Sequence, residues 1–160
     1  MARYMGSLMP TNSHHSSAPA RGAGADYGHT SDRSALAVSE RYPGGIFGVS
    51  FVMGIPSSPD RKPSETYRDI AIAAKVRGAR TVASDGHYKE AAREEYERHG
   101  VSFKLAASTE DIFEAGRSIM REQRLALGSL SEVDRGLLAR RIAAVLTIPT
   151  SGGKSRLVVP

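Results

Sequence analysis

Short apolar runs alternate with longer segments of helical periodicity from residue 44 to residue 148, and this alternation limits the fold more than any other feature. β-Branched and aromatic residues fill the short runs, as is typical of strands, whereas apolar residues in the longer segments recur every three or four positions. Strands that alternate with helices run parallel and are covered by those helices. We therefore expect an α/β domain, a small three-layer sandwich with a short, mostly parallel sheet. The expected strands are 46–53, 80–84 and 101–105, and the expected helices are 64–77, 88–99, 108–120 and 131–145.

Two of the expected helices begin with the same capping pattern. Ser108 is followed three residues later by Asp111, and Ser131 by Asp134. A serine hydroxyl at this position accepts a hydrogen bond from a first-turn amide, while the carboxylate reaches back toward the helix start. The pattern predicts helix starts at both serines, and Ser64 is expected to cap the first helix.

A mostly α-helical domain is the alternative interpretation. The runs around Thr81 and Val101 are short. Apolar periodicity alone does not separate a short strand from a connector between helices.

The composition changes near residue 43. Residues 1–43 are rich in Ser, Gly, Ala and His and contain one brief apolar stretch, 34–38. Such a segment buries too little apolar surface to offset the entropy lost on ordering, so we expect a disordered tail. The lack of acidic residues before Asp26 is also found in organelle transit peptides, although the cytoplasm is the default location. The expected organisation is a tail over 1–43, an α/β domain over 44–148 and a C-terminal tail over 149–160.

The totals exclude several classes of protein. The chain of 160 residues has no cysteine, which excludes disulfides, thiolate metal sites and cysteine nucleophiles. No run of eighteen apolar residues occurs, so we expect no membrane-spanning helix. The formal net charge of +5 favours nucleic acid or another acidic partner, although the basic residues are interspersed with acidic ones, as on ordinary solvated surfaces.

The turn after the second expected strand carries the candidate ligand-binding residues. Ligands bind beyond the carboxyl ends of parallel strands, and Asp85 and His87 follow the strand 80–84. Asp85 can accept hydrogen bonds from ribose hydroxyls, and His87 can exchange protons near neutral pH. Asp-Gly is also a common turn dipeptide, so ordinary turn chemistry explains Asp85 as well. The histidines within 1–43 lack partners at metal-ligand spacing, and no metal centre is expected.

The most specific string in the sequence is Pro149-Thr150-Ser151-Gly152-Gly153-Lys154-Ser155, which follows the apolar run 145–148. It resembles the phosphate-binding loop of superfamily 2 helicase-like ATPases, in which a strand leads into Pro-Thr-x-x-Gly-Lys-Ser/Thr. The resemblance implies that ATP and Mg²⁺ bind here. The amides of Gly152 and Gly153 would hold phosphate, Lys154 would meet the β and γ phosphates, and Ser155 would coordinate Mg²⁺. The resemblance covers only 149–160, and a flexible polar tail is the alternative.

Three functional hypotheses follow. The first is a nucleotide- or nucleic-acid-associated protein, the truncated leader of a helicase-like ATPase, which rests on 149–155 and on the positive charge. The second is a non-catalytic α/β module that binds a ligand or partner near Asp85. The third is a small hydrolase or transferase that uses Asp85 and His87. The sequence leaves open whether the chain is an enzyme.

Overall fold

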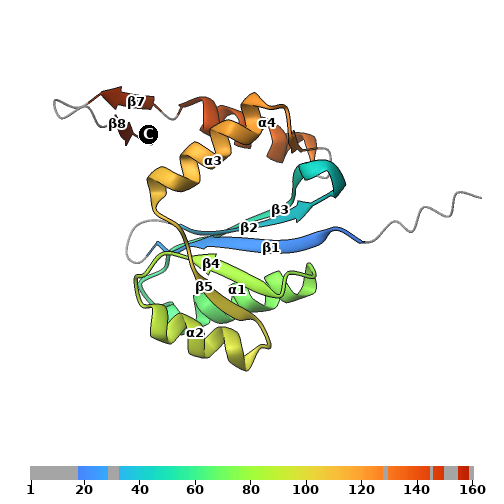
Figure 1. Cartoon of the computed structure of the whole chain (residues 1–160). Helices are drawn as coiled ribbons and strands as arrows, with labels where there is room; N and C mark the ends of the chain where they lie inside the picture. Colours follow the sequence, from blue (N-terminus) through green and yellow to red (C-terminus); the bar gives the residue numbers. More distant parts are fainter. Residues whose placement is uncertain (1–17, 29–32, 128–129, 145, 150–154, 159–160) are drawn as a thin grey trace, which may run out of the picture.

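The computed structural model describes residues 18–28, 33–127, 130–144, 146–149 and 155–158. The main sheet consists of β1 (Ala20–Asp26), β2 (Ser34–Arg41), β3 (Phe47–Ile55), β4 (Thr81–Ser84), β5 (Ser102–Leu105) and β6 (Leu125–Ala126). The helices are α1 (Pro63–Val76), α2 (Lys89–Arg98), α3 (Thr109–Arg121) and α4 (Glu132–Ala144), and a separate hairpin pairs β7 (Leu146–Pro149) with β8 (Ser155–Val158). The domain has three layers, because α1 and α2 cover one face of the main sheet and α3 and α4 cover the other (Figure 1).

The strand order β5-β4-β1-β2-β3-β6 combines an antiparallel meander with parallel additions. β1, β2 and β3 pair antiparallel in chain order. β4 then pairs parallel with β1, β5 with β4, and β6 with β3. Every strand of the main sheet except β2 therefore runs in the same direction. The carboxyl ends of β1, β3, β4 and β5 meet at one edge of the sheet, the carboxyl edge, which is where ligands bind in α/β sheets.

The expected fold class is confirmed, since the domain is α/β with three layers and most strands share one direction. All four expected helices are present, and so are the short strands at 81–84 and 102–105. The alternative of a mostly helical domain is wrong, because β4 and β5 pair along their whole length. Within the described part of the chain, no helix is both long enough and apolar enough to cross a bilayer.

The predicted disordered tail over 1–43 is wrong for residues 20–26 and 34–41, which form β1 and β2 in the middle of the sheet. β2 alternates buried and exposed residues, and its buried side chains include polar ones, so the sequence carries a weak hydrophobic signal there. The neighbouring strands and α1 bury the inner face of β2, and the composition of the segment does not predict this burial. Residues 1–17 lie outside the described residues. The buried side chains of β2 are Ser34, Leu36, Val38 and Glu40.

The buried carboxylate of Glu40 is paired on both of its oxygens. Glu40 is 5% exposed. The Arg21 side chain of β1 donates to Oε1 at 2.8 Å, and the hydroxyl of Tyr42 donates to Oε2. An unpaired buried charge would be strongly destabilising, so these two neighbours allow β2 to keep a carboxylate on its inner face.

The closely packed core lies between the main sheet and the α1–α2 layer. Leu36 and Val38 of β2 and Val82 of β4 are at most 1% exposed and pack with the inner face of α1. α1 contributes residues at helical spacing, as predicted. These residues are Tyr67, Ile70, Ala71 and Ala74.

The capping predictions are confirmed at two helices and wrong at the third. The hydroxyl of Ser108 accepts from the Asp111 amide at 3.2 Å, and the hydroxyl of Ser131 accepts from the Asp134 amide at 3.1 Å. Ser64, in contrast, lies inside α1. That helix starts one residue earlier because proline, with its fixed φ and no N–H, suits the first helical position, and the residue before it is the cap.

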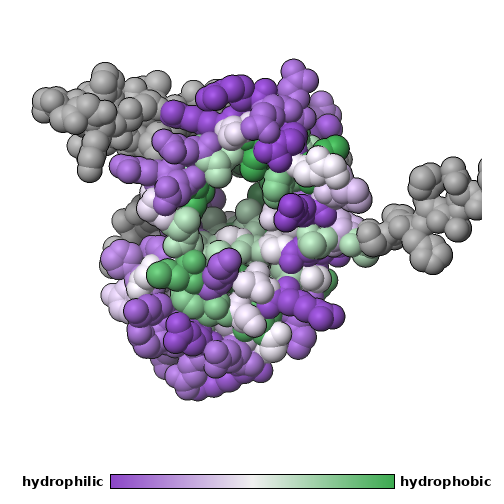
Figure 2. All heavy atoms as spheres, viewed as in Figure 1, coloured by the Kyte–Doolittle hydropathy of each residue, from purple (hydrophilic) through white to green (hydrophobic). Residues whose placement is uncertain are grey.

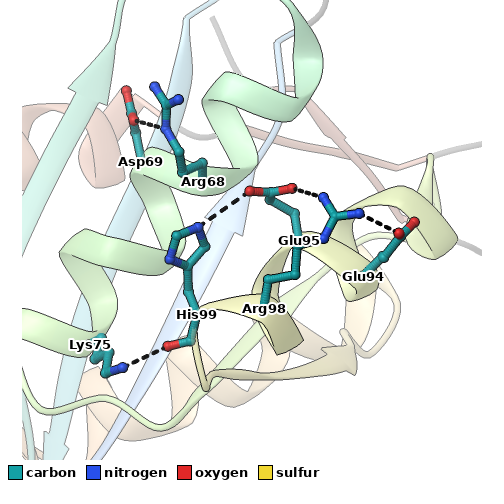
Figure 3. A network of polar contacts seen from close by, with 7 residues as sticks. All are labelled: Arg68, Asp69, Lys75, Glu94, Glu95, Arg98 and His99. Carbon is teal, nitrogen blue, oxygen red and sulfur yellow. Dashed lines mark hydrogen bonds and ion pairs between the residues drawn. The ribbon is translucent and has the colours of Figure 1, made fainter.

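A polar network joins the end of α2 to α1 (Figure 3). Glu95 accepts from Arg98 at 2.8 Å and lies 3.3 Å from the Nε2 atom of His99. Arg98 also pairs with Glu94. The ammonium group of Lys75 on α1 donates to the His99 carbonyl at 2.9 Å. Exposed pairs of this kind contribute little individually, so the network orients α2 against α1 more than it stabilises the fold.

The α3–α4 layer packs loosely on the opposite face. α3 has an apolar side, yet none of its residues is buried, and Ile112 is 51% exposed. Figure 2 shows an opening between this layer and the sheet, with apolar residues around it. A cavity of about 680 Å³ lies there, between the sheet and residues that include Ile112 and Leu137. One face of the sheet is therefore closely packed and the other is accessible.

Replacing Leu36 by alanine tests the position of β2 in the core. Leu36 is 1% exposed, so Leu36→Ala should leave a cavity and lower the free energy of unfolding by about 2–5 kcal/mol. Ile72→Ala on the outer face of α1, where Ile72 is 43% exposed, should cost less than about 1 kcal/mol. Urea unfolding followed by circular dichroism measures both. Equal small losses would contradict a central β2.

Candidate functional site

Two aspartates lie next to each other at the carboxyl edge. Asp26 is the last residue of β1, and Asp85 directly follows β4. The two strands pair in parallel with Gly24 opposite Ala83, and two residues further on this register brings Asp26 level with Asp85. Adjacent strands are about 4.8 Å apart. Both side chains are exposed, and they come from neighbouring positions on adjacent strands.

The sequence indicates Asp85 as a candidate but does not indicate Asp26. Asp85 follows a recognisable strand, whereas the composition of residues 1–43 predicts a tail. The available signal was an acidic residue at the end of the Ala- and Gly-rich stretch 20–25, too weak to identify a strand by periodicity.

Asp85 and His87 lie in one tight turn. The Oδ1 atom of Asp85 accepts from the backbone amide of His87 at 3.2 Å, the arrangement of an aspartate turn. The predicted turn chemistry is therefore present. Both side chains are exposed, and the hydrogen bond between the two residues uses the His87 backbone. A proton-transfer role for the His87 imidazole stays a prediction.

The cavity of about 680 Å³ opens beside Asp26 on the α3–α4 face of the sheet. Arg33 and Asp134 lie on its wall. The carboxylate of Asp134 is held by the hydroxyl of Ser131 at 2.7 Å, as part of the helix cap. Arg33 is exposed. Residues with little or no side chain form part of the floor, beside Val52 and Met53: Gly24, Ala35, Ala37, Gly54 and Ala83.

Three tyrosines are buried on the other face of the sheet, behind the two aspartates. The hydroxyls of Tyr27 and Tyr96 are hydrogen-bonded, and the rings of Tyr27 and Tyr67 meet edge to face with centroids 4.9 Å apart. Burial raises the pKa of Tyr27 and of Tyr96 above the ordinary value. Burial also raises the pKa of Tyr67 to about 12, and the charge of Asp85 contributes to this increase. All three phenols therefore stay protonated at neutral pH.

The string that resembles a P-loop falls mostly on residues that the structure does not describe. Gly152, Gly153 and Lys154 lie outside the described residues. Ser155 begins β8, which pairs with β7 in a hairpin. The phosphate-binding resemblance stays a prediction from the sequence.

Asp26 and Asp85 are the described residues best placed to hold a divalent cation. No group of three His, Asp or Glu residues within the described ranges has the arrangement of a metal site. Magnesium commonly keeps several waters, however, and takes one or two carboxylates together with oxygens of a phosphate substrate. Two exposed carboxylates at one edge fit that open mode of binding and do not fit a closed structural site.

No protein-family model matches the sequence, and no curated protein matches it. Solved structures do match the fold. The large terminase nuclease of thermophilic phage G20c is similar at a TM-score of 0.67 and 14% identity, over 88% of this chain and 73% of that one. The nuclease domain of the large terminase subunit gp2 of bacterial virus Sf6 is similar at 0.59 and 12%, over 87% and 77%.

The large terminase of bacteriophage HK97 is similar at a TM-score of 0.62 and 17% identity over 89% of this chain. This chain covers 36% of the HK97 protein. The chain thus has the ribonuclease H-like fold of terminase nuclease domains. At these identities the likeness concerns the fold alone.

The raised pKa of Tyr67 predicts a loss of stability in alkali. The unfolded chain releases the phenol proton near the ordinary pKa of 10, whereas the folded chain holds it to about 12. The stabilisation is therefore complete below pH 10 and is lost as the pH rises from 10 through 12. Urea unfolding at pH 8, 10 and 11 should show the decline.

The control for this prediction is Tyr67→Phe, which has no proton to lose and should show a smaller decline over the same range. An identical pH dependence in the wild type and in Tyr67→Phe would rule out Tyr67 as the cause.

Proposed function

We propose that this chain is a nuclease domain that hydrolyses phosphodiester bonds of nucleic acid with a divalent metal ion. The observation that carries the proposal is the placement of Asp26 and Asp85 at the carboxyl ends of adjacent parallel strands. Hard divalent cations prefer carboxylate and phosphate oxygens. An exposed pair of carboxylates can therefore hold a cation where a nucleic-acid backbone can reach it.

Proteins of the same fold support this reading. The G20c terminase nuclease has been solved with bound cobalt, at 16% identity to this chain. The Sf6 nuclease domain, as a K428A mutant, has been solved with manganese and beta-thujaplicinol, at 12% identity. Because identity is this low, the roles of Asp26 and Asp85 rest on their geometry in this chain.

The two aspartates would bind and orient the metal ion. Such an ion, when bound, polarises phosphate oxygens and lowers the pKa of a water molecule. Both carboxylates are exposed, so a substrate as bulky as a nucleic-acid strand can approach them. Asp85 also accepts from the His87 amide, which fixes one of its oxygens and leaves the other for a cation.

Arg33 extends the site toward the substrate. It lines the same cavity as Asp26. No ion pair joins Arg33 to another residue in the described part of the chain. A guanidinium group binds phosphate through two parallel hydrogen bonds, so Arg33 is suited to hold a backbone phosphate beside the two carboxylates. The net charge of +5 favours the same polyanionic substrate.

Nucleotide binding at 149–155 is a separate proposal that rests on the sequence. It rests on the motif alone, because Ser155 begins the strand β8, whereas a helix follows the loop in a P-loop. Lys154→Ala should abolish binding of ATP with Mg²⁺ in a calorimetric titration and leave cleavage of nucleic acid unchanged. Equal ATP binding by the wild type and the variant would refute it.

Asparagine substitutions test the nuclease proposal. Asp26→Asn and Asp85→Asn keep the side-chain shape and remove the charge that a cation needs. Each should lower Mg²⁺- or Mn²⁺-dependent cleavage of DNA by about 100-fold or more, equivalent to roughly 2.7 kcal/mol of transition-state stabilisation. Gel assays on plasmid and oligonucleotide substrates, with and without a chelator, measure the rate.

Glu97→Gln is the matched control, because Glu97 is an exposed carboxylate on α2, away from the carboxyl edge. It should cleave at the wild-type rate. Binding of DNA by the wild type without any metal-dependent cleavage would favour the non-catalytic module predicted as an alternative. Full activity in both asparagine variants would exclude the two aspartates as the site.

A further inference from the structure

A cluster of hydroxyl groups is buried directly behind the two aspartates. Its members come from the elements that surround the site, namely β1, β4, α1 and α2. Each member is at most 7% exposed, and three of the four are phenols. The members are Tyr27, Ser84, Tyr67 and Tyr96.

The cluster includes the chain neighbour of each aspartate. Tyr27 follows Asp26 at the end of β1, and Ser84 precedes Asp85 at the end of β4. Adjacent Cα atoms are 3.8 Å apart across a rigid peptide. Anything that fixes Tyr27 therefore fixes the backbone from which the Asp26 carboxylate projects.

One hydrogen bond joins β1 to α2 within the cluster. The hydroxyls of Tyr27 and Tyr96 bond to each other, and both side chains are buried. Tyr67 packs edge to face on Tyr27, and its own hydroxyl has no hydrogen-bond partner among the described residues. The Tyr27–Tyr96 bond thus connects the end of β1 to α2, the helix that follows Asp85 in the chain.

Stability alone does not explain these hydroxyls. Replacing both partners of a buried hydrogen bond by apolar groups of the same shape can be nearly neutral, so a pair of phenylalanines would fill this space at little cost in stability. Buried polar bonds are directional, however, and they select one arrangement of the elements that carry them. A need to fix the relative positions of β1 and α2 explains the Tyr27–Tyr96 pair better than a need to fill the core.

The charge of Asp85 also affects the pKa of two tyrosines in the cluster. The negative charge of Asp85 raises the pKa of both Tyr27 and Tyr67, in addition to the larger effect of burial. The phenols remain neutral, so they place no competing negative charge behind the carboxylates.

We propose that Tyr27 and Tyr96 are positioning residues whose shared hydrogen bond sets the separation of the Asp26 and Asp85 carboxylates for a divalent cation. This inference rests on the proposed function, because it concerns the same metal site. Neither tyrosine touches the metal or the substrate. Their effect passes through the backbone of β1 and through the placement of α2 behind β4.

Manganese binding to the whole chain tests the proposal. Titration with Mn²⁺, followed by the electron paramagnetic resonance signal of the free ion, gives a Kd without any need for catalysis. Tyr27→Phe and Tyr96→Phe should each raise this Kd about tenfold, the lower end of what the loss of outer partners costs a metal site. The double variant should be no weaker than Tyr27→Phe, since that substitution by itself already removes the Tyr27–Tyr96 hydrogen bond.

Tyr67→Phe is the matched control. It removes a buried phenol hydroxyl from the same cluster but leaves the Tyr27–Tyr96 bond in place, so its Kd should stay within about twofold of the wild type. Tyr96→Phe removes the same hydrogen bond by a change on α2, so the test can still be made if Tyr27→Phe folds poorly. The positioning role is overturned if both variants bind Mn²⁺ like the wild type, if Tyr67→Phe weakens binding equally, or if the two effects add.

The same titration separates this inference from the proposed function. Wild-type chain that binds Mn²⁺ but cleaves no nucleic acid would refute the nuclease activity, while the Kd values of the variants would still decide the positioning role. Wild-type chain that does not bind Mn²⁺ would refute both.

Discussion

The parallel pairing of β1 with β4 is the interaction on which the candidate site depends. It joins the antiparallel meander of β1, β2 and β3 to the strands β4 and β5. Ala23 and Val82 face each other in the core beneath α1, where both are buried. That contact fixes the register, and the register places Asp26 level with Asp85. Without it, the two carboxylates would belong to separate sheets and could not share a cation.

The two faces of the sheet differ in how closely they are packed. The α1–α2 face is closely packed and holds the backbone behind the site, whereas the α3–α4 face is open and contains the cavity beside Asp26. A site that must hold a metal ion needs ligands on rigid elements, and a polymeric substrate needs access from one side. The unequal packing of the two layers suits the proposed function, and several Gly and Ala residues of the sheet line the open side.

The buried charged group has a hydrogen-bond partner on each of its oxygens, whereas not every buried neutral hydroxyl has a partner. Glu40 has a donor on each oxygen. The Tyr27–Tyr96 bond is satisfied, while the hydroxyl of Tyr67 has no partner among the described residues. An unpaired charge would cost far more than an unpaired hydroxyl, which explains this order. The uncompensated hydroxyl of Tyr67 lies in the cluster behind the candidate site.

Local signals in the sequence determined the helices and the strands β4 and β5. The apolar spacing within 64–77 and the caps at Ser108 and Ser131 act over a few residues, so they can be recognised without a structure. Asp85 was recognisable for the same reason, since it follows a strand that the sequence indicates. β1 and β2 were not, because strands rich in Ala, Gly and Ser gain their stability from the elements that cover them. Only the tertiary structure decided that Asp26 lies beside Asp85, since a register between strands far apart in the chain depends on packing and leaves no local pattern.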